Sequence, residues 1–432
     1  MEKVVKDKSD IVEYFENGCK KKNQLKIGVE HEKFFFENQS ENRINFPTVL
    51  KIFNYLTKFG WKPVKERGNI ISLLRADQTI TLEPGNQIEL SGGKLDSLHL
   101  SCEESFKYLA ELKETCNHLN LKMMSVSFDP ISKLKNIPGT PKERYKIMTR
   151  TMPKNGKLSL EMMYQTTGTQ INLDYISEND FKKKFKLISN LVPLSIAIFA
   201  NSPFKEGKMN GYLSYRSRVW HDTARGGLPK IYLEGMDFEK YADMVIKAPL
   251  LFLSKNNKYL SVPNKTFKDL MEGKIKKISN SKATLDDLKN HLSTIFTEVR
   301  LKQYLEIRSL DTCEWNCHCA GPALYLGLLY GNLEAALDVI KNWKTNEVLN
   351  AYKEAPKKGL NTLINSKSLL EWGKIFLKLS DEGLRRRSVK NTKGVDETIF
   401  LKNVKKVLKE NKTKAELAVE RFKTYKSFDF LY

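Results

Sequence analysis

The stretch Ile27-Gly-Val-Glu-His-Glu-Lys-Phe-Phe-Phe36 is a run of strand-forming residues that carries two carboxylates, Glu30 and Glu32. A strand sends positions i and i+2 to the same face, so both carboxylates project from one patch of a sheet. Two negative charges at that spacing repel, and a protein keeps them together around a divalent cation or an arginine. A wet edge strand, with both carboxylates and His31 solvated, is the alternative.

Two further carboxylates follow in residues 68–93, which read as three strands joined by two turns. Glu83 stands just before the second turn and Glu89 shortly after it, so the meander brings both back towards the first pair. Glu83 also suits a solvated position beside the turn. Glu89 is flanked by apolar residues in an alternating strand, which places it on the face opposite the core.

Amide and guanidinium groups come next along the chain. Residues 141–153 predict a helix with Arg144 and Arg150 near one side, and residues 162–174 predict a strand. Gln170 and Asn172 lie on the almost wholly polar face of that strand. Such a face is either a wet edge or the floor of a polar pocket, where amides orient hydroxyl or carboxylate ligands.

Residues 200–229 form the longest stretch without clean periodicity, and long irregular segments in compact domains are usually functional or disordered. Tyr215, Arg216, Arg218 and Trp220 argue against disorder. Guanidinium groups are suited to binding a substrate carboxylate or a phosphate, and surface ion pairs are the plain alternative.

Residues 296–311 carry Glu298 with Arg300 and then Glu306 with Arg308, each pair on one strand face. This segment offers the candidate site one more carboxylate and one more guanidinium.

With 432 residues, 41% of them hydrophobic, the chain is long enough for a substantial core. Helices are predicted at 9–22, 46–60 and 95–120, and a buried helix at 187–204. Beyond Pro322 the periodicity predicts helices at 322–330, 332–343, 368–387, 397–411 and 413–425. We therefore expect an α+β fold in which residues 1–330 form an antiparallel-sheet core and residues 331–432 a helical region packed on the same core, as one domain.

The net charge of +22 fits either a nucleic-acid or membrane surface or an enzyme with anionic substrates. The lysines are spread along the whole chain, which favours the enzyme. The N-terminus lacks a signal-peptide pattern and no segment has the length of a membrane span, so we expect a cytoplasmic protein without membrane contact.

Six cysteines in so long a chain do not make a disulfide scaffold, and we expect a reducing compartment. Cys313, Cys317, His318 and Cys319 superficially suggest zinc. No second ligand pair at finger-like spacing accompanies them, which favours structural or incidental thiols.

Several carboxylates on sheet strands, arginines nearby and no Walker or Rossmann glycine loop together suggest ATP handled through metal ions. At this point the sequence resembles the glutamate–cysteine ligase family in its plant and proteobacterial branch. The resemblance runs from about residue 26 to Tyr432, and its motifs are Ile27 to Phe36, Leu82-Glu-Pro-Gly-Asn-Gln-Ile-Glu-Leu-Ser-Gly92, Ala200-Asn-Ser-Pro-Phe-Lys-Glu-Gly207, Arg216-Ser-Arg-Val-Trp220 and Glu298-Val-Arg-Leu-Lys-Gln-Tyr-Leu-Glu-Ile-Arg308.

The resemblance implies a glutamine-synthetase-like curved antiparallel sheet flanked by helices. It also implies ATP-dependent ligation of L-glutamate, through γ-glutamyl phosphate, to the amine of L-cysteine, the first step of glutathione biosynthesis. The implied cofactor is Mg²⁺, with Mn²⁺ as an alternative, and ATP is a co-substrate. A plastid transit peptide is missing, which suggests a bacterial cytosolic member, and we expect a monomer or a homodimer.

The resemblance also implies roles for individual residues. The metal positions are Glu30, Glu32, Glu83, Glu89 and Glu306, with Gln170 in a water-mediated role. Arg216 and Arg308 are the catalytic candidates. The substrate-binding candidates are Arg216, Arg218, Trp220, Asn172, Arg144, Arg150 and Tyr215.

In plant members of the family a regulatory disulfide links the cysteines that correspond to Cys102 and Cys319, which makes this pair a redox candidate here. A second plant disulfide lacks its partners, since Ser261 occupies one of its sites. Two rival interpretations are a ligase of the same fold with a different acceptor amine and a basic nucleic-acid-binding protein.

Overall fold

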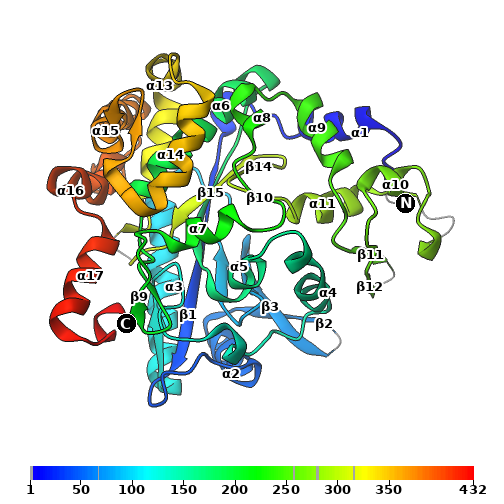
Figure 1. The fold of residues 1–432 in the computed structure, drawn as a ribbon, viewed down its shortest axis with the longest axis horizontal. Helices are drawn as coiled ribbons and strands as arrows, with labels where there is room; N and C mark the ends of the chain where they lie inside the picture. Colours follow the sequence, from blue (N-terminus) through cyan, green and yellow to red (C-terminus); the bar gives the residue numbers. More distant parts are fainter. Residues whose placement is uncertain (1–2, 67, 256–257, 279–281, 315–316) are drawn as a thin grey trace.

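The fold is built on one large antiparallel sheet, seen in the computed structural model, which describes residues 3–66, 68–255, 258–278, 282–314 and 317–432 (Figure 1). Its strands follow the order β14-β15-β7-β1-β5-β4-β3-β2, and β6 pairs with the far half of β1. Their bounds are β1 Ile27–Glu37, β2 Lys62–Glu66, β3 Asn69–Arg75, β4 Gln78–Leu82, β5 Ile88–Ser91, β6 Leu121–Met124, β7 Gly168–Leu173, β14 Val299–Leu301 and β15 Leu305–Asp311.

β1 is the centre of this sheet because it pairs with β5 on one side and with β7 on the other. Glu30 lies opposite Ser91 and Gln170, and Glu32 lies opposite Glu89. Residues directly paired across antiparallel strands point to the same face. The register therefore collects polar side chains of β1, β5 and β7 on one face, which is called the front face below.

Helices pack on both faces of the sheet and along its edges. They are α1 Lys8–Glu16, α2 Phe46–Leu56, α3 Leu98–Leu119, α4 Glu143–Thr151, α5 Ser159–Gln165, α6 Glu178–Ile198, α7 Tyr215–His221, α8 Lys230–Glu234, α9 Phe238–Lys247, α10 Phe267–Met271 and α11 Leu285–Ser293, followed by α12 Ala320–Leu326, α13 Leu333–Ile340, α14 Thr345–Lys358, α15 Leu369–Arg387, α16 Lys402–Glu410 and α17 Lys414–Tyr425. Eight minor strands, β8 Phe204–Lys205, β9 Lys208–Met209, β10 Gly226–Gly227, β11 Leu253–Lys255, β12 Lys258–Leu260, β13 Phe296–Thr297, β16 Leu363–Ile364 and β17 Lys367–Ser368, form two-stranded pairs.

The predicted buried helix is α6, whose second half from Leu187 to Ile198 is buried at every residue. It packs on β15 and against the later helices α14 and α15. One apolar cluster runs from Val5 near the N-terminus to Leu408 in α16. The helical C-terminal region thus shares its core with the sheet, and Figure 1 shows α13 to α17 gathered on one side of it.

Three segments differ from the sequence-based prediction. Residues 162–174 are not one strand, because helix formers between Ser159 and Gln165 build α5 before β7 begins at Gly168. The segment predicted to be irregular contains α7, which Ser214 caps through its side chain. Residues 296–311 fold as the β14–β15 hairpin rather than as one strand. The sequence pattern also gave no sign of α14.

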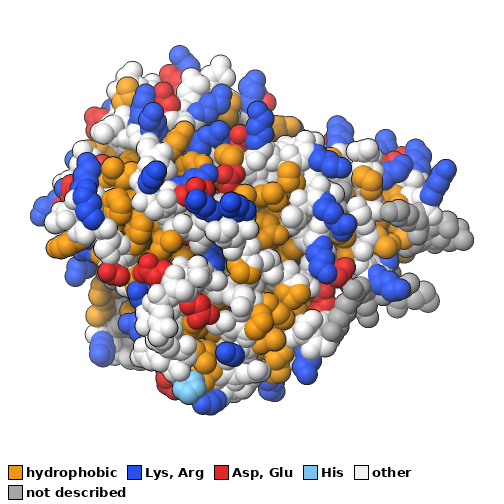
Figure 2. Space-filling model, turned by 60° about the horizontal axis from the view of Figure 1, so that its bottom comes forward, with side chains coloured by type: hydrophobic (Ala, Val, Ile, Leu, Met, Phe, Trp, Pro, Cys, Tyr) orange, Lys and Arg blue, Asp and Glu red, His pale blue; other side chains and the backbone are white. Residues whose placement is uncertain are grey.

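Charged side chains are scattered over the surface. Figure 2 shows lysines and arginines spread across the whole visible face, with acidic side chains between them. Within the described residues no single helix combines the length and the apolar composition of a membrane span, although the bent pair 320–331 and 333–340 reaches both together.

Candidate active site

The front face of the sheet forms the floor of a cavity of about 460 Å³. Helices α4 and α5 and the end of α7 form its wall. The predicted site residues that line it are Glu30, Glu32, Glu83, Glu89, Gln170, Asn172, Arg144, Trp220 and Arg308. The predicted convergence of four distant carboxylates is thereby confirmed, while their role as metal ligands stays a prediction.

Glu30 and Glu32 receive few hydrogen bonds. Asn172 Nδ2 donates to Glu30 Oε1 at 2.7 Å. The Gly168 amide donates to Glu32 Oε2 at 2.6 Å, and Gln170 Nε2 reaches Glu32 Oε1 at 3.3 Å. All these donors are uncharged groups of β7, so they orient the carboxylates without neutralising them.

Glu83 and Glu89 are held by hydroxyl groups. Ser91 Oγ donates to Glu89 Oε1 at 2.9 Å, and Tyr145 OH of α4 donates to Glu83 Oε2 at 3.1 Å. Thr81 lies between the two, with its Oγ1 3.4 Å from Glu83 and 3.3 Å from Glu89. Lys142 and Arg144 of the α4 segment lie near enough to interact electrostatically with Glu83, and the described residues form no ion pair within 4.0 Å of Glu83 or Glu89.

This crowding changes the acidity of the carboxyl groups. Burial, together with the nearby charge of Glu83, raises the pKa of Glu32 to about 7. Burial, together with Glu30, Glu83 and Glu32, raises the pKa of Glu89 well above its usual range. A cation among these oxygens would reverse the effect, because it favours the charged form of each carboxyl group.

The donor set suits a hard divalent cation, since it consists of carboxylate and amide oxygens. As they stand, no three His, Cys, Asp or Glu side chains of the described residues are arranged to hold a metal ion.

Arg308 and Arg144 bring positive charge to the cavity. Arg308 Nη1 donates to Gln170 Oε1, and its guanidinium carbon lies 5.2 Å from the Trp220 ring. Arg144 Nη2 donates to Tyr145 OH at 2.9 Å, and its Nε is buried without a hydrogen-bond partner. That nitrogen remains available to an anionic ligand.

Glu306 does not line the cavity. The β14–β15 hairpin places it opposite Arg300, which donates Nε at 2.8 Å and Nη2 at 2.6 Å to its two oxygens. Lys302 lies 3.1 Å away and Arg308 also contacts it. Although burial opposes the effect, these cations hold the pKa of Glu306 well below its usual range. Its charge is already neutralised, which disfavours the predicted role as a metal ligand.

Four predicted substrate-binding residues also lie outside the cavity lining. Arg216 is buried behind it, where Nη2 donates to the Arg308 carbonyl at 2.7 Å. Arg218, on the other side of α7, pairs with Asp222 at 3.4 Å. Tyr215 packs against Phe128 with ring centroids 4.8 Å apart.

Arg150 is the fourth of these residues and lies exposed on α4, donating to the Lys146 carbonyl. The prediction that Arg144 and Arg150 share a side was wrong, because six positions along a helix turn the side chain by about 120°.

The end of the cavity beyond Asn172 is basic, and sequence reasoning missed it. Lys26, Lys94, Arg300, Lys302 and Tyr304 line this part. Lys302 and Tyr304 belong to the turn of the β14–β15 hairpin. This turn lies at the same end of the sheet as the start of β1, because Leu305 and Ile27 both pair with Leu173 of β7, from opposite sides. Only the strand order brings these residues together, and no local motif signals it.

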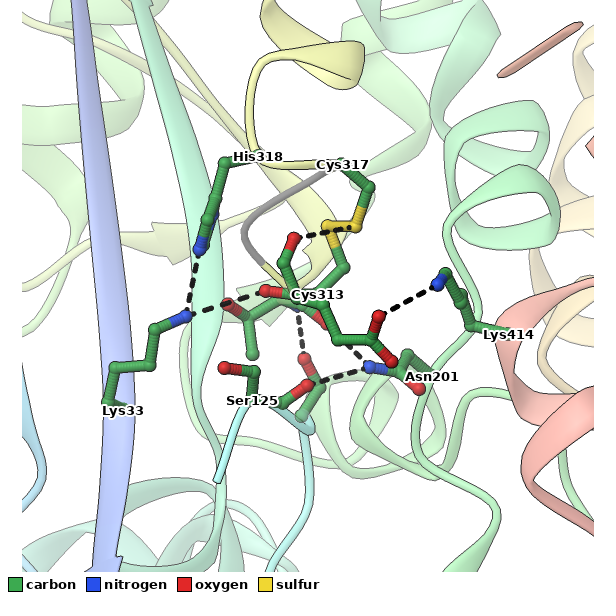
Figure 3. Close-up of a disulfide and its surroundings, with 10 residues drawn as sticks. Lys33, Ser125, Asn201, Cys313, Cys317, His318 and Lys414 are labelled. Atoms are coloured by element: carbon green, nitrogen blue, oxygen red, sulfur yellow. Dashed lines mark hydrogen bonds and ion pairs between the residues drawn. A yellow bond between two sulfur atoms is a disulfide. The ribbon is translucent and has the colours of Figure 1, made fainter. Parts of the chain in front are cut away.

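Two of the three cysteines that were expected to be structural or incidental thiols are paired with each other. Cys313 and Cys317 form a disulfide (Figure 3). Cys102 and Cys319, the redox candidates, are free thiols that hydrogen bond to each other, and this contact lowers the pKa of Cys102.

Comparison with known proteins agrees with the geometry. The chain matches glutamate–cysteine ligase family 2 (GCS2) over residues 26–425. It is 40% identical over 421 residues to the chloroplastic glutamate–cysteine ligase of Nicotiana tabacum, covering 96% of this chain and 80% of the relative. The chloroplastic enzyme of Arabidopsis thaliana is 38% identical over 421 residues, with 96% and 80% covered.

The chain belongs to glutamate–cysteine ligase family 2. The predicted family is therefore confirmed.

The α+β fold predicted for a glutamate–cysteine ligase family member is confirmed too. A crystal structure of the Francisella tularensis glutamate–cysteine ligase, solved in complex with AMP, superposes with a TM-score of 0.53 at 12% identity and covers 94% of this chain and 86% of that one. At this identity the likeness supports the fold alone.

Proposed function

We propose that this chain phosphorylates the γ-carboxylate of L-glutamate with ATP and then joins the activated acyl group to the amine of L-cysteine. The product is γ-glutamylcysteine, which starts glutathione synthesis. Family membership and the 40% identity to the tobacco enzyme support glutamate–cysteine ligase activity and its dependence on ATP. The observation that carries the proposal is the convergence of Glu30, Glu32, Glu83 and Glu89 on one cavity floor.

The reaction explains why such a cavity is needed. A carboxylate is a poor acyl donor until one of its oxygens becomes part of a leaving group, and phosphoryl transfer provides that group. Mg²⁺, when bound, would neutralise the triphosphate and stabilise the charge that moves during transfer. The residues that would hold it are Glu30, Glu32, Glu83 and Glu89, with Gln170 acting through water.

The protein's cations suit the remaining anionic groups. Arg308 and Arg144 point into the cavity beside the carboxylate cluster, where a guanidinium can bind a carboxylate or a phosphoryl group. Arg216 supports Arg308 from behind through its carbonyl, so we assign it a positioning role. The Trp220 ring packs against the guanidinium groups of Arg216, at 4.9 Å, and Arg308, at 5.2 Å, and helps to orient them.

The direct test supplies the purified chain with ATP, magnesium, L-glutamate and L-cysteine and identifies the product by mass spectrometry. We expect γ-glutamylcysteine and one ADP per product, and no turnover without magnesium. A panel of other amines in place of cysteine decides between this acceptor and a different one. A preferred product with another amine would overturn the assignment of cysteine while leaving the ligase chemistry intact.

A further inference from the structure

A second cavity, of about 420 Å³, lies where α7 meets α14 and is called the outer pocket below. Its lining consists of Tyr212, Arg218, His221, Lys353, Glu354, Lys357 and Lys358. None of these residues lines the active-site cavity. The volume of the outer pocket is in the range of sites that hold a small molecule.

The outer pocket keeps an excess of positive charge after its ion pairs are counted. Its one lining carboxylate, Glu354, pairs with Lys358 at 2.9 Å, and Arg218 pairs at 3.4 Å with the aspartate four positions on. Lys353 and Lys357 are exposed and form no ion pair with the described residues. They lie four positions apart on α14 and so share one side of the helix. Two cations without a counter-charge at a concave surface attract anions.

The end of α14 explains only part of this charge. Lysines in a last turn interact favourably with the helix dipole, and Lys357 and Lys358 are in the last turn of α14. Lys353 lies one turn earlier, and Arg218 belongs to a different helix. The cluster therefore contains more positive charge than the helix end favours.

His221 adds a buried group without a partner to the outer pocket. Its Nε2 is shielded from solvent and forms no hydrogen bond with the described residues. Burial, together with Arg218 and Lys353, lowers the pKa of His221 to about 4, so the ring is neutral. Buried ring nitrogens are normally hydrogen-bonded. An oxyanion bound beside the ring would supply the missing acceptor and offset the two cations that help to keep the ring uncharged.

His221 also connects the outer pocket to the active site. It directly follows Trp220, whose ring lines the active-site cavity. Its own ring packs on Tyr352 of α14 with centroids 3.9 Å apart, and Tyr352 OH donates to Glu298 Oε1 at 2.8 Å. The Glu298 carbonyl accepts from the Arg308 amide at 2.9 Å. A ligand that joins α7 to α14 therefore acts on groups that hold the cavity wall and Arg308.

We propose that the outer pocket binds a small phosphate monoester and that its occupancy strengthens substrate binding in the active site. Lys353 and Lys357 bind the phosphate group from α14, and Arg218 and His221 bind it from α7. The Tyr212 ring offers a surface for the organic part. The bound phosphate removes the repulsion between the cations of the two helices, so α7 is held in one position. This effect on the reaction rests on the proposed function, whereas binding does not.

Calorimetry at low salt measures the binding without a ligase assay. Glucose 6-phosphate, inorganic phosphate and glucose are each titrated into the full-length chain. We expect glucose 6-phosphate to bind with a Kd below about 1 mM, inorganic phosphate to bind at least about threefold more weakly, and glucose not to bind. Inorganic phosphate that bound as tightly as glucose 6-phosphate would overturn the assignment of a monoester.

A matched set of variants separates the outer pocket from the arginines of the active site, which also attract phosphate. Lys353→Gln combined with Lys357→Gln should weaken glucose 6-phosphate binding at least about tenfold. Lys374→Gln combined with Lys378→Gln removes two exposed lysines at the same spacing on α15, outside the pocket, and should leave the affinity unchanged. Equal affinity in wild type and the Lys353/Lys357 variant would overturn the site, whether or not the chain is a ligase.

Histidine NMR locates the ligand within the molecule. The His221 signal is identified by its loss in His221→Gln, and its pH titration is followed with and without glucose 6-phosphate. The bound phosphate should raise the pKa of His221, because it offsets the charges of Arg218 and Lys353. An unchanged His221 titration at saturating glucose 6-phosphate would place the ligand elsewhere and overturn the proposal.

Initial rates test the effect on the reaction. At constant ionic strength, saturating glucose 6-phosphate should raise kcat/KM for ATP about threefold in wild type and in the Lys374/Lys378 variant, and leave the Lys353/Lys357 variant unchanged. If kcat/KM in wild type did not rise while calorimetry showed binding, the regulatory part of the proposal would be wrong and the binding site would stand.

Discussion

The two faces of β1 handle charge in opposite ways. On the front face Glu30 and Glu32 border an open cavity and accept hydrogen bonds from the uncharged groups of Gly168, Gln170 and Asn172. On the back face His31 and Lys33 are 2% and 1% exposed. Burial lowers the pKa of Lys33 to about 7, and it lowers the pKa of His31 to about 3, with Lys33 adding to that shift.

The difference separates a binding site from a buried polar contact. A buried base can become neutral by losing a proton and then fit into a packed core. Four carboxylates beside a cavity can lower their repulsion either by taking up protons or by binding a cation, and only the second choice leaves them charged at neutral pH. The alternation Glu-His-Glu-Lys thus divides a ligand-binding face from a packing face within four residues.

The largest expected effect comes from removing one front-face carboxylate. Glu89→Gln should lower kcat by about 100-fold or more, because it removes an oxygen ligand while leaving the shape of the side chain unchanged. The chain should stay folded by circular dichroism. Glu103→Gln, exposed on α3, is the control and should keep full activity. Normal turnover in the Glu89 variant would remove this residue from the site.

Arg308 lines the cavity and Arg218 does not, so the same substitution should affect activity differently at the two positions. Arg308→Lys should lower kcat/KM by about 10- to 100-fold, because lysine lacks the planar fork that contacts Gln170 and stacks on Trp220. Arg218→Lys should change it by less than about twofold, since Arg218 lies outside the cavity lining. Equal losses in steady-state kinetics would show that the face of α7 that carries Arg218 also acts on the substrate.

The front face should also show a pH-dependent cost in stability. Because the folded-state pKa of Glu32 is raised to about 7, the folded protein loses stability as pH rises from about 4.5 to about 7. In metal-free buffer at pH 8, Glu32→Gln should therefore have a free energy of unfolding larger than that of wild type by a difference on the order of 2 kcal/mol, and it should unfold at a higher temperature. The two proteins should coincide near pH 4. If Glu32→Gln were less stable than wild type at pH 8, the front-face carboxylates would not repel one another as proposed.

On the back face, the destabilisation by Lys33 should depend on pH in the opposite direction, and its net effect on stability should be smaller. The folded-state pKa of Lys33 is depressed, so its cost in stability is full below about pH 7 and fades as pH rises towards 10.5. Lys33→Met removes the buried charge and also the contacts of Lys33 with His318 and the Cys313 carbonyl. The net result at pH 6 should be a stabilisation of about 1 kcal/mol. Thermal unfolding at pH 6 and pH 10 measures the difference, which should shrink at the higher pH.

Much of the site could be predicted because strand periodicity is local. The spacing of Glu30 and Glu32, and the turn between Glu83 and Glu89, place four carboxylates on one face without knowledge of the full strand order. That Glu306 pairs with arginine and lies outside the cavity could not be predicted in this way. Its ion pair depends on the β14–β15 register, which places Arg300 opposite it.

Helical segments set a second limit. Arg218 was assigned to the site from the family resemblance and Arg150 from its expected place beside Arg144, yet neither side chain lines the cavity once its helix is formed. The basic end formed by Lys26, Lys94 and Lys302 arises only from the order of strands in the sheet.

The central claim is that the front-face carboxylates bind a divalent cation together with a nucleotide. Calorimetric titration of Mn²⁺ into the chain, with a non-hydrolysable ATP analogue present, tests it most directly when run at pH 7 in two buffers of different ionisation enthalpy. The account predicts binding with release of protons from the carboxyl groups, and affinity at least about tenfold weaker in Glu32→Gln and Glu89→Gln. Equal affinity in wild type and both variants would contradict it.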